Sequence, residues 1–424
     1  MTDLLQRETQ PHLDDRHSSA SSTINRRPSG SQVASSVSRF LGRCSSFIGY
    51  TILVIVLGAA SLELISWAIW CIHPYTRQAE LENQIGSPVY TGAAWAREFW
   101  QEESARRKKP AVYVPFRLWS VTYWQGKYIN NDQGVRGVWR RTINPANCDA
   151  PHKITVWIFG GSTMYGTAVP DWATIPSYLS RELNGRSDDC VVVSNFGVEG
   201  YVTDQELILL GEQLKAGGHP DIVIFYDGVN DSSLAWPPSS PPNAHFLFGS
   251  IKTRVEGSVS GRLDFLQKSY ASRLVREGLS RLHPASSYAS LASKTQPNVL
   301  ATVDNYEANM RLARALGEAY NFKLYCFWQP ILVYGHKPFV PFEQQMAMRD
   351  ASGTTADSAW FLTIAAAYRE AERRAAGSGN FIFLGSLFDS TKEPVYVDEA
   401  HLGPRGNEIA AEAIASYIKD HPEH

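Results

Sequence analysis

One stretch near the middle of the chain, Ile154-Thr-Val-Trp-Ile-Phe-Gly-Gly-Ser-Thr-Met-Tyr-Gly166, constrains the fold more than any other. Its apolar run predicts a buried strand, and the paired glycines at 160 and 161 predict a tight turn where the strand ends. Ser162 follows directly, at the start of a segment that is compatible with a helix. In a parallel α/β sheet, the carboxyl ends of the strands form the edge where ligands bind. The pattern therefore predicts that Ser162 lies at the functional edge of such a sheet.

Three other interpretations of this stretch have to be weighed. A phosphate-binding loop requires a lysine where Thr167 stands. The nucleophile elbow of α/β-hydrolases requires a glycine where Met164 stands. The third alternative is a glycine turn that closes a core strand and is followed by an incidental serine, and this stretch alone does not exclude it.

Three further segments favour a catalytic serine. Residues 191–200 and 221–231 are strand patterns that end in glycine-rich turns, and Tyr396-Val-Asp-Glu-Ala-His401 lies near the C-terminus. The order Ser162, Gly200, Asn230 and Asp398-x-x-His401 resembles the motif blocks of the SGNH (GDSL-type) hydrolase family. The resemblance spans about residues 154–418. The chain departs from the family's name motif, because Gly161-Ser162-Thr163 stands where Gly-Asp-Ser-Leu is usual.

The chemistry of the motifs is consistent with nucleophilic catalysis. A serine needs an adjacent base, and histidine is the usual base near neutral pH. Among the eleven histidines, His401 is favoured because Asp398 precedes it at a spacing that puts both side chains on one face of a single turn. Asp398 can then orient one ring nitrogen while the other faces Ser162. For the Asp398–His401 pair taken alone, a helix cap beside a surface histidine is the alternative.

The resemblance also implies an oxyanion hole. Its donors would be the backbone N–H groups of Ser162 and Gly200 and the side-chain amide of Asn230. Gly200 is preferred to Gly197 because it follows Asn195 at the spacing the family shows. The alternative for Asn230 is an ordinary turn residue.

Alternating strand and helix patterns from residue 154 onward predict an α/β fold with a parallel sheet. The resemblance implies a three-layer flavodoxin-like sheet with helices on both faces, over 151–424. An insertion at about 232–303 interrupts this domain and is interpreted as a lid or substrate wall, or else as an irregular surface excursion. Residues 73–150 are expected to pack on the domain as strands and loops. Arg136 is expected in a structural salt bridge, and the alternative is that it lines the site. Gln329 is expected at the active edge, either touching substrate or capping a turn.

Residues 46–72 predict a transmembrane anchor, because about 20 apolar residues span a bilayer. Arg26, Arg27, Arg39 and Arg43 precede this stretch, and only Arg77 follows closely. The positive-inside rule then places residues 1–45, an expected disordered tail, in the cytoplasm and everything after residue 73 in the periplasm or outside the cell. The expected location is the inner (cytoplasmic) membrane, with a single pass. A cleaved signal peptide is the alternative, because residues 58–60 are small.

Composition and spacing exclude several other classes. The formal net charge of -2 gives no electrostatic case for a nucleic-acid partner. The cysteines and histidines lack zinc-ligand spacing, and no cofactor motif is evident. Cys148 and Cys190 are a candidate disulfide, because they precede strands that are neighbours in a flavodoxin-like order. The alternative is two unrelated thiols.

The sequence therefore predicts a membrane-anchored serine esterase. Its expected substrate is a small-molecule or polysaccharide ester, with O-acyl (acetyl) groups on a carbohydrate favoured, and its expected route is an acyl-enzyme. Two alternatives stay open. One is an O-acyltransferase for a cell-surface polysaccharide, and the other is a non-catalytic glycan-binding scaffold.

Overall fold

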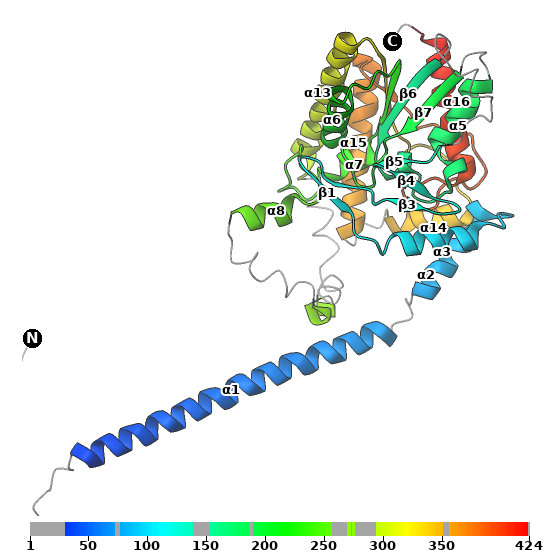
Figure 1. The fold of residues 1–424 in the computed structure, drawn as a ribbon. Helices are drawn as coiled ribbons and strands as arrows, with labels where there is room; N and C mark the ends of the chain where they lie inside the picture. Colours follow the sequence, from blue (N-terminus) through cyan, green and yellow to red (C-terminus); the bar gives the residue numbers. More distant parts are fainter. Residues whose placement is uncertain are drawn as a thin grey trace, which may run out of the picture. The chain divides into compact units, whose positions relative to one another are not determined.

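The computed structural model describes residues 30–72, 77–138, 153–185, 190–256, 269–272, 274–275, 294–350 and 356–422 (Figure 1). The chain divides into two compact units, Met1–Ile65 and Ser66–His424. Most of helix α1 (Gly30–Ile72) belongs to the first unit, and the sheet and its covering helices belong to the second.

Helix α1 contains a segment, Arg43–Ile69, that is long and apolar enough to cross a membrane. Its mean hydropathy is 2.3, and its large apolar side chains are exposed. The helix begins at Gly30, so the predicted disordered tail to residue 45 extends too far toward the C-terminus. No proline occurs between positions 29 and 72, and a nucleated helix gains one hydrogen bond for each residue it adds. Residues 1–29 lie outside the described residues.

The second unit is built on an eight-stranded sheet in the order β10-β9-β8-β6-β7-β5-β4-β3. Its parallel strands are β6 (Lys153–Gly160), β7 (Cys190–Asn195), β8 (Ile222–Asp227), β9 (Lys323–Trp328) and β10 (Ile382–Phe383). Read from β7, these strands follow the 2-1-3-4-5 order of flavodoxin-like folds. The predicted fold class is therefore confirmed.

Alternate residues of the parallel strands enter two different cores. The register places Trp157 beside Val223 and Val223 beside Leu324, and all three belong to one buried cluster. Their neighbours along the chain, including Ile158 and Ile224, belong to a second cluster on the opposite face. Apolar side chains that point both ways explain why these strands read as continuous apolar runs rather than as alternating patterns.

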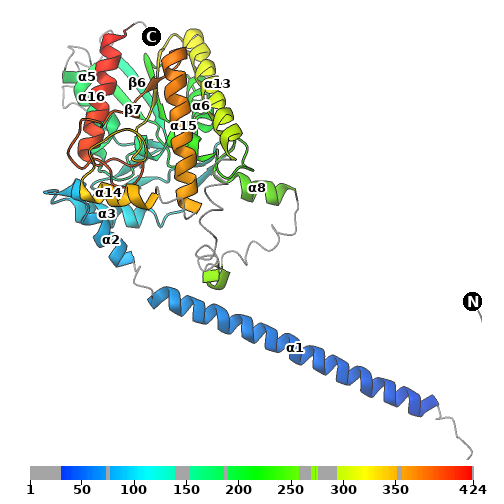
Figure 2. The same ribbon diagram turned by 180° about the vertical axis from the view of Figure 1, so that it is seen from behind.

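Helices cover both faces of the sheet (Figures 1 and 2). Helices α5 (Ile175–Gly185) and α16 (Pro404–Asp420) pack on one face, and α6 (Thr203–Lys215), α13 (Gln296–Tyr320) and α15 (Ala356–Ser378) pack on the other. Buried alanines at 410, 411 and 415 allow α16 to lie close to the sheet. The apolar faces of these helices thus close the two cores.

The segment before β6 extends the sheet instead of only packing against it. Strand β5 (Val135–Arg136) pairs antiparallel with β7 through Arg136 and Asn195, and β4 (Asn130–Asp132) and β3 (Trp124–Gln125) follow outward. The remaining elements are α2 (Arg77–Ile85), η1 (Pro88–Tyr90), α3 (Ala96–Arg106) and the hairpin of β1 (Val112–Val114) and β2 (Leu118–Ser120). An aromatic cluster that includes Phe99, Trp100 and Tyr128 holds α2, η1 and α3 together.

The described part of the predicted insertion contains helices. Helix α13 begins at Gln296, inside the predicted insertion, and a proline in its first turn suits a helix N-terminus. Helices α7 (Val229–Ser233) and α8 (Phe248–Val255) occupy its beginning. Helix α14 (Pro341–Asp350) follows β9 in the chain.

Candidate active site

Two glycines place Ser162 at the end of β6. A Cβ atom at Gly160 would lie 2.7 Å from both the Met164 Cβ and the Tyr226 carbonyl oxygen. A Cβ atom at Gly161 would lie 2.3 Å from the Nδ2 of Asn230. These positions must therefore be glycine for the short helix α4 (Ser162–Tyr165) to start against the ends of β6 and β8.

A closed loop between β10 and α16 carries the other two predicted catalytic side chains. The backbone N–H of Val397 donates to the carbonyl of His401, and that of Gly403 donates to the carbonyl of Val395, both at 2.8 Å. Inside this loop, the Asp398 carboxylate accepts from the backbone N–H groups of Ala400 at 3.0 Å and His401 at 2.8 Å. The backbone therefore holds the Asp398 carboxylate in place independently of the His401 imidazole.

The loop brings the imidazole of His401 between Asp398 and Ser162. Its Nδ1 lies 2.7 Å from Oδ2 of Asp398, and its Nε2 lies 2.8 Å from Oγ of Ser162. With the ring proton on Nδ1, the histidine donates to the carboxylate and accepts from the serine hydroxyl. The structure therefore assembles the three residues as a serine, a base and the group that orients the base, which is the geometry of a Ser-His-Asp triad.

The pKa values of Asp398 and His401 are shifted in opposite directions, and each shift favours the charged form of that residue. Burial acts to raise the pKa of Asp398, but attraction to His401 and three hydrogen bonds lower it to about 2. The Asp398 side chain is 44 % exposed, so we give its burial less weight than these bonds. Burial acts to lower the pKa of His401, but Asp398 outweighs it and raises that pKa above its usual value. The raised pKa makes the imidazole a stronger base toward the serine proton.

The predicted oxyanion donors converge on the same edge. Asn230 donates one Nδ2 hydrogen to the carbonyl of Tyr201 at 2.7 Å, which holds its amide against Gly161. Gly200 has a φ of 78°, a left-handed conformation that favours glycine. Within the described residues, its backbone N–H donates no hydrogen bond, whereas that of Gly197 donates to Asn195 at 2.9 Å. The geometry thus favours Gly200 over Gly197.

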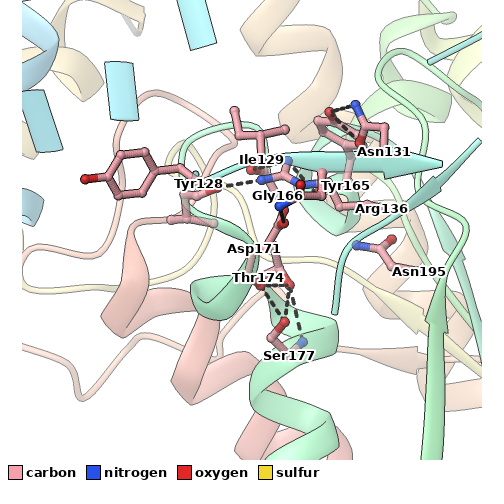
Figure 3. A network of polar contacts seen from close by, with 12 residues as sticks. Tyr128, Ile129, Asn131, Arg136, Tyr165, Gly166, Asp171, Thr174, Ser177 and Asn195 are labelled. Carbon is pink, nitrogen blue, oxygen red and sulfur yellow. Dashed lines mark hydrogen bonds and ion pairs between the residues drawn. The ribbon is translucent and has the colours of Figure 1, made fainter. Parts of the chain in front are cut away.

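Around the end of α4, Arg136 forms a buried network of polar contacts (Figure 3) that is larger than the predicted salt bridge. Its Nε donates to Asp171 at 2.7 Å, and its two Nη groups donate to the carbonyls of Tyr165, Gly166 and Val169. The side chain is fully buried. These carbonyls lie at the end of α4 and just after it, so Arg136 supports the segment that carries the serine and does not line the site.

Two amide side chains also support the serine turn. Gln329, which follows β9, donates to the hydroxyl of Thr163 at 3.2 Å. Asn195, at the end of β7, donates to the carbonyl of Met164 at 3.1 Å. Of the two roles predicted for Gln329, the structure therefore shows the structural one. In the sequence, Asn195 served only as the spacing reference for Gly200, and its contact with the serine turn was not predicted.

Three buried carboxyl groups lie around the helix that carries Asn230. Glu206, Asp227 and Asp231 are each at most 3 % exposed. Burial raises the pKa of Asp231 to about 6. Burial, followed by repulsion from neighbouring carboxyl groups, raises the pKa of Glu206 and Asp227 well above their usual values. Both shifts favour the protonated forms of Glu206 and Asp227. In the described part of the chain, no group of His, Cys, Asp or Glu side chains is arranged as a metal site.

The predicted disulfide is only partly visible. Cys190, at the start of β7, is disulfide-bonded. Cys148, its predicted partner, lies outside the described residues, so the pairing stays a prediction. The described cysteines at 44, 71 and 326 are free.

Searches for similar proteins returned structures but no sequences. No family model matches the chain, and no curated protein sequence matches it. Similar solved structures include a lipase/acylhydrolase from Enterococcus faecalis (15% identity, 63% of this chain, 96% of that one, TM-score 0.33). Others are a catalytic mutant of Axe2, an acetylxylan esterase from Geobacillus stearothermophilus (15%, 62%, 94%, 0.34), and a carbohydrate acetylesterase family member from Sinorhizobium meliloti (13%, 63%, 98%, 0.31). We draw no functional conclusion from similarities at these TM-scores, and the proposed function rests on the geometry of the site alone.

Proposed function

We propose that this chain is a serine esterase that cleaves its substrate through an acyl-enzyme. The observation that carries the proposal is the 2.8 Å contact between Nε2 of His401 and Oγ of Ser162, with Asp398 on the far side of the ring. The serine stands at the carboxyl edge of a parallel sheet, where ligands bind in such folds. A non-catalytic scaffold would not require a serine, a base and an orienting carboxylate in this arrangement.

The chemistry follows from the atoms in place. His401 Nε2 takes the proton of Ser162 as the serine oxygen bonds to the ester carbonyl carbon. The oxyanion that forms is stabilised by the N–H groups of Ser162 and Gly200 and by the second Nδ2 hydrogen of Asn230. The protonated imidazole then gives its proton to the departing alkoxide. Water repeats the sequence on the acyl-enzyme and releases the acid.

The substrate that we propose is an O-acyl, and more narrowly an O-acetyl, ester of a carbohydrate. An acyl acceptor sugar in place of water would make the same site an O-acyltransferase for a cell-surface polysaccharide. We further propose that α1 anchors the enzyme in the inner (cytoplasmic) membrane with its N-terminus inside. Its apolar stretch of 27 residues supports this placement.

One experiment separates the three functions. The full chain in detergent is incubated with 4-nitrophenyl acetate, and separately with acetylated xylo-oligosaccharides in the presence of an unacetylated acceptor. Free acetate and acetylated acceptor are both measured. An esterase releases acetate, a transferase acetylates the acceptor, and a scaffold does neither. Absence of both products from a folded protein would reject the proposal.

A further inference from the structure

A pocket of about 300 Å³ opens beside the proposed oxyanion hole. Its lining includes the charged side chains of Arg106, Arg107, Lys109 and Glu199, together with Trp119. The cations come from the end of α3 and the residues that follow it, whereas Glu199 comes from the loop after β7. The pocket therefore lies between the N-terminal extension and the catalytic domain.

The pocket shares its wall with the catalytic edge. The backbone N–H of Val198, a lining residue, donates to the carbonyl of Gly160 at 3.0 Å. The indole N–H of Trp119 donates to the carbonyl of Glu199 at 2.9 Å. A Cβ atom at Gly200 would lie 3.5 Å from the Trp119 ring. A substrate whose carbonyl oxygen reaches Gly200 would thus place its neighbouring groups at this pocket.

The two carboxylates beside the pocket, Glu103 and Glu199, are already paired with arginines. Arg106 donates to both carboxylate oxygens of Glu103, at 2.6 and 2.7 Å, and to Glu199 at 2.9 Å. Arg107 donates to Glu103 through Nε alone, at 2.6 Å. Its two Nη groups make no hydrogen bond within the described residues, although Nη2 lies 3.9 Å from Glu199. Three cations thus face two carboxylates.

Lys109 supplies the surplus charge. Its side chain is exposed, lines the pocket and pairs with no carboxylate in the part of the chain that the structure describes. Within the described residues, the donors that make no hydrogen bond are therefore the two Nη groups of Arg107 and the ammonium of Lys109. The paired N–H groups of a guanidinium match the geometry of a carboxylate.

We propose that this pocket binds a carboxylate of the substrate, so that the preferred ester is carried by an acidic sugar rather than a neutral one. The inference rests on the proposed esterase function and narrows its substrate class. The alternative is a purely structural role, in which the basic residues 106–109 stabilise the C-terminus of α3 by interacting with the helix dipole. Lys108 separates the two explanations, because it belongs to the same run but lines a different cavity, on the side of α2.

The test uses one glycan in two charge states. Acetylated oligogalacturonate is prepared with its carboxylates free or methyl-esterified, and acetate release is measured for wild type, Lys109→Gln, Arg107→Gln and the control Lys108→Gln. Hydrolysis of 4-nitrophenyl acetate by each variant reports whether the catalytic residues are intact. Binding of unacetylated oligogalacturonate, followed by tryptophan fluorescence, reports on the pocket without any chemistry.

Wild type should show a kcat/KM at least about fivefold higher for the free acid than for its methyl ester, as expected for about 1 kcal/mol of partly exposed ion pairing. Lys109→Gln should lose most of this preference while keeping its aryl acetate turnover, and added salt should do the same. Lys108→Gln should behave as wild type. Because Arg107 also donates to Glu103, the variant Arg107→Gln can fail to fold. In that case Lys109→Gln remains the decisive variant.

Each other outcome has one meaning. Aryl acetate turnover with equal rates on the acid and the methyl ester would overturn the inference and leave the esterase intact. An equal loss of preference in Lys108→Gln would favour general charge attraction and overturn the pocket. Failure to cleave any ester, together with binding of oligogalacturonate that Lys109→Gln weakens, would overturn the esterase and uphold the anion site.

Discussion

At the scale of single residues, the site depends on backbone-held polar groups. Two backbone N–H groups hold the Asp398 carboxylate in place independently of its contact with the imidazole. Asn230 is held in the same way by the carbonyl of Tyr201. Groups that are already oriented need no reorganisation as charge develops in the transition state. Catalysis should therefore be sensitive to these two side chains in different ways.

Asn230→Ala should lower kcat by on the order of 10²–10³, the usual cost of losing one oxyanion donor. KM should change little, because the lost hydrogen bond forms mainly in the transition state. Steady-state kinetics on 4-nitrophenyl acetate measure both constants, with Asn298→Ala, which lies on α13, as a matched amide control. A tenfold rise in KM at unchanged kcat would assign Asn230 to ground-state binding instead.

The pH dependence should follow the protonation of His401. The base must be neutral, so kcat/KM should fall as the pH drops through a pKa above about 6.5, because Asp398 raises it. Asp398→Asn removes the main raising effect and should move this acid limb to lower pH, while kcat falls by on the order of 10⁴. A pH–rate profile of both proteins decides it. An acid limb that stays in place in Asp398→Asn would show that this carboxylate does not act on the titrating base.

Single residues were predicted from the sequence where chemistry narrows the choice. A strand end followed by Gly-Gly-Ser and an Asp-x-x-His pair identified the side chains that the structure brings together. Asn195, Gln329 and Glu199 were not assigned their contacts, because each bonds to a residue that is distant in sequence. Polar residues of this kind are common, and nothing in the local sequence shows which of them will be buried against the site.

At the scale of elements, the three carboxyl groups of Glu206, Asp227 and Asp231 connect α6, β8 and α7 at the position of Asn230. Carboxyl groups whose folded-state pKa is raised hold protons that the unfolded chain releases. Their contribution to stability is complete below the unfolded-state pKa and is lost as the pH rises through the folded-state pKa. For Asp231, this window runs from about 4 to about 6, and the pKa values of Glu206 and Asp227 are shifted in the same direction.

Glu206→Gln should therefore reduce the loss of stability at high pH. An amide keeps a polar neutral group in the cluster but has no proton to lose. The melting temperature of the variant relative to wild type should rise between pH 5 and pH 8, by about 2 °C or more, which corresponds to roughly 1 kcal/mol. Glu318→Gln on the exposed side of α13 is the control. Parallel pH profiles of wild type and Glu206→Gln would show that the cluster does not titrate on unfolding.

Elements were predictable in the parallel sheet and less so around it. The strands β6 to β9 are apolar on both faces, so each can be recognised in the sequence as a continuous apolar run. Strands β3 and β5 have only two residues each, so no periodicity can develop in them. Their place in the sheet is set by side chains such as the buried Arg136, whose partners lie after α4.

At the scale of the whole molecule, an apolar helix is followed in the chain by an α/β unit with a triad at its sheet edge. The 424 residues thus combine a candidate anchor with a candidate enzyme. The arginines on the N-terminal side of α1 favour retention of that end in the cytoplasm. The disulfide at Cys190 is consistent with a catalytic unit exposed to an oxidising compartment.

The topology gives a prediction of its own. An alkaline phosphatase fusion after His424 should be active in the periplasm, and a green fluorescent protein fusion exported by the general secretory route at the same site should stay dark. Replacing Arg39 and Arg43 by Glu should weaken or invert this orientation. The reverse pattern of reporters would place the triad in the cytoplasm, and a mature N-terminus near residue 61 would replace the anchor by a cleaved signal.

The most direct test of the central claim is covalent labelling of Ser162. The full chain in detergent is treated with a fluorophosphonate, and the modified peptide is mapped by mass spectrometry. We expect one adduct on Ser162, formed faster as the pH rises through the His401 pKa, and strongly reduced labelling in His401→Ala. A folded protein that is left unlabelled, or labelled equally in Ser162→Ala, would contradict the assignment of Ser162 as the activated nucleophile.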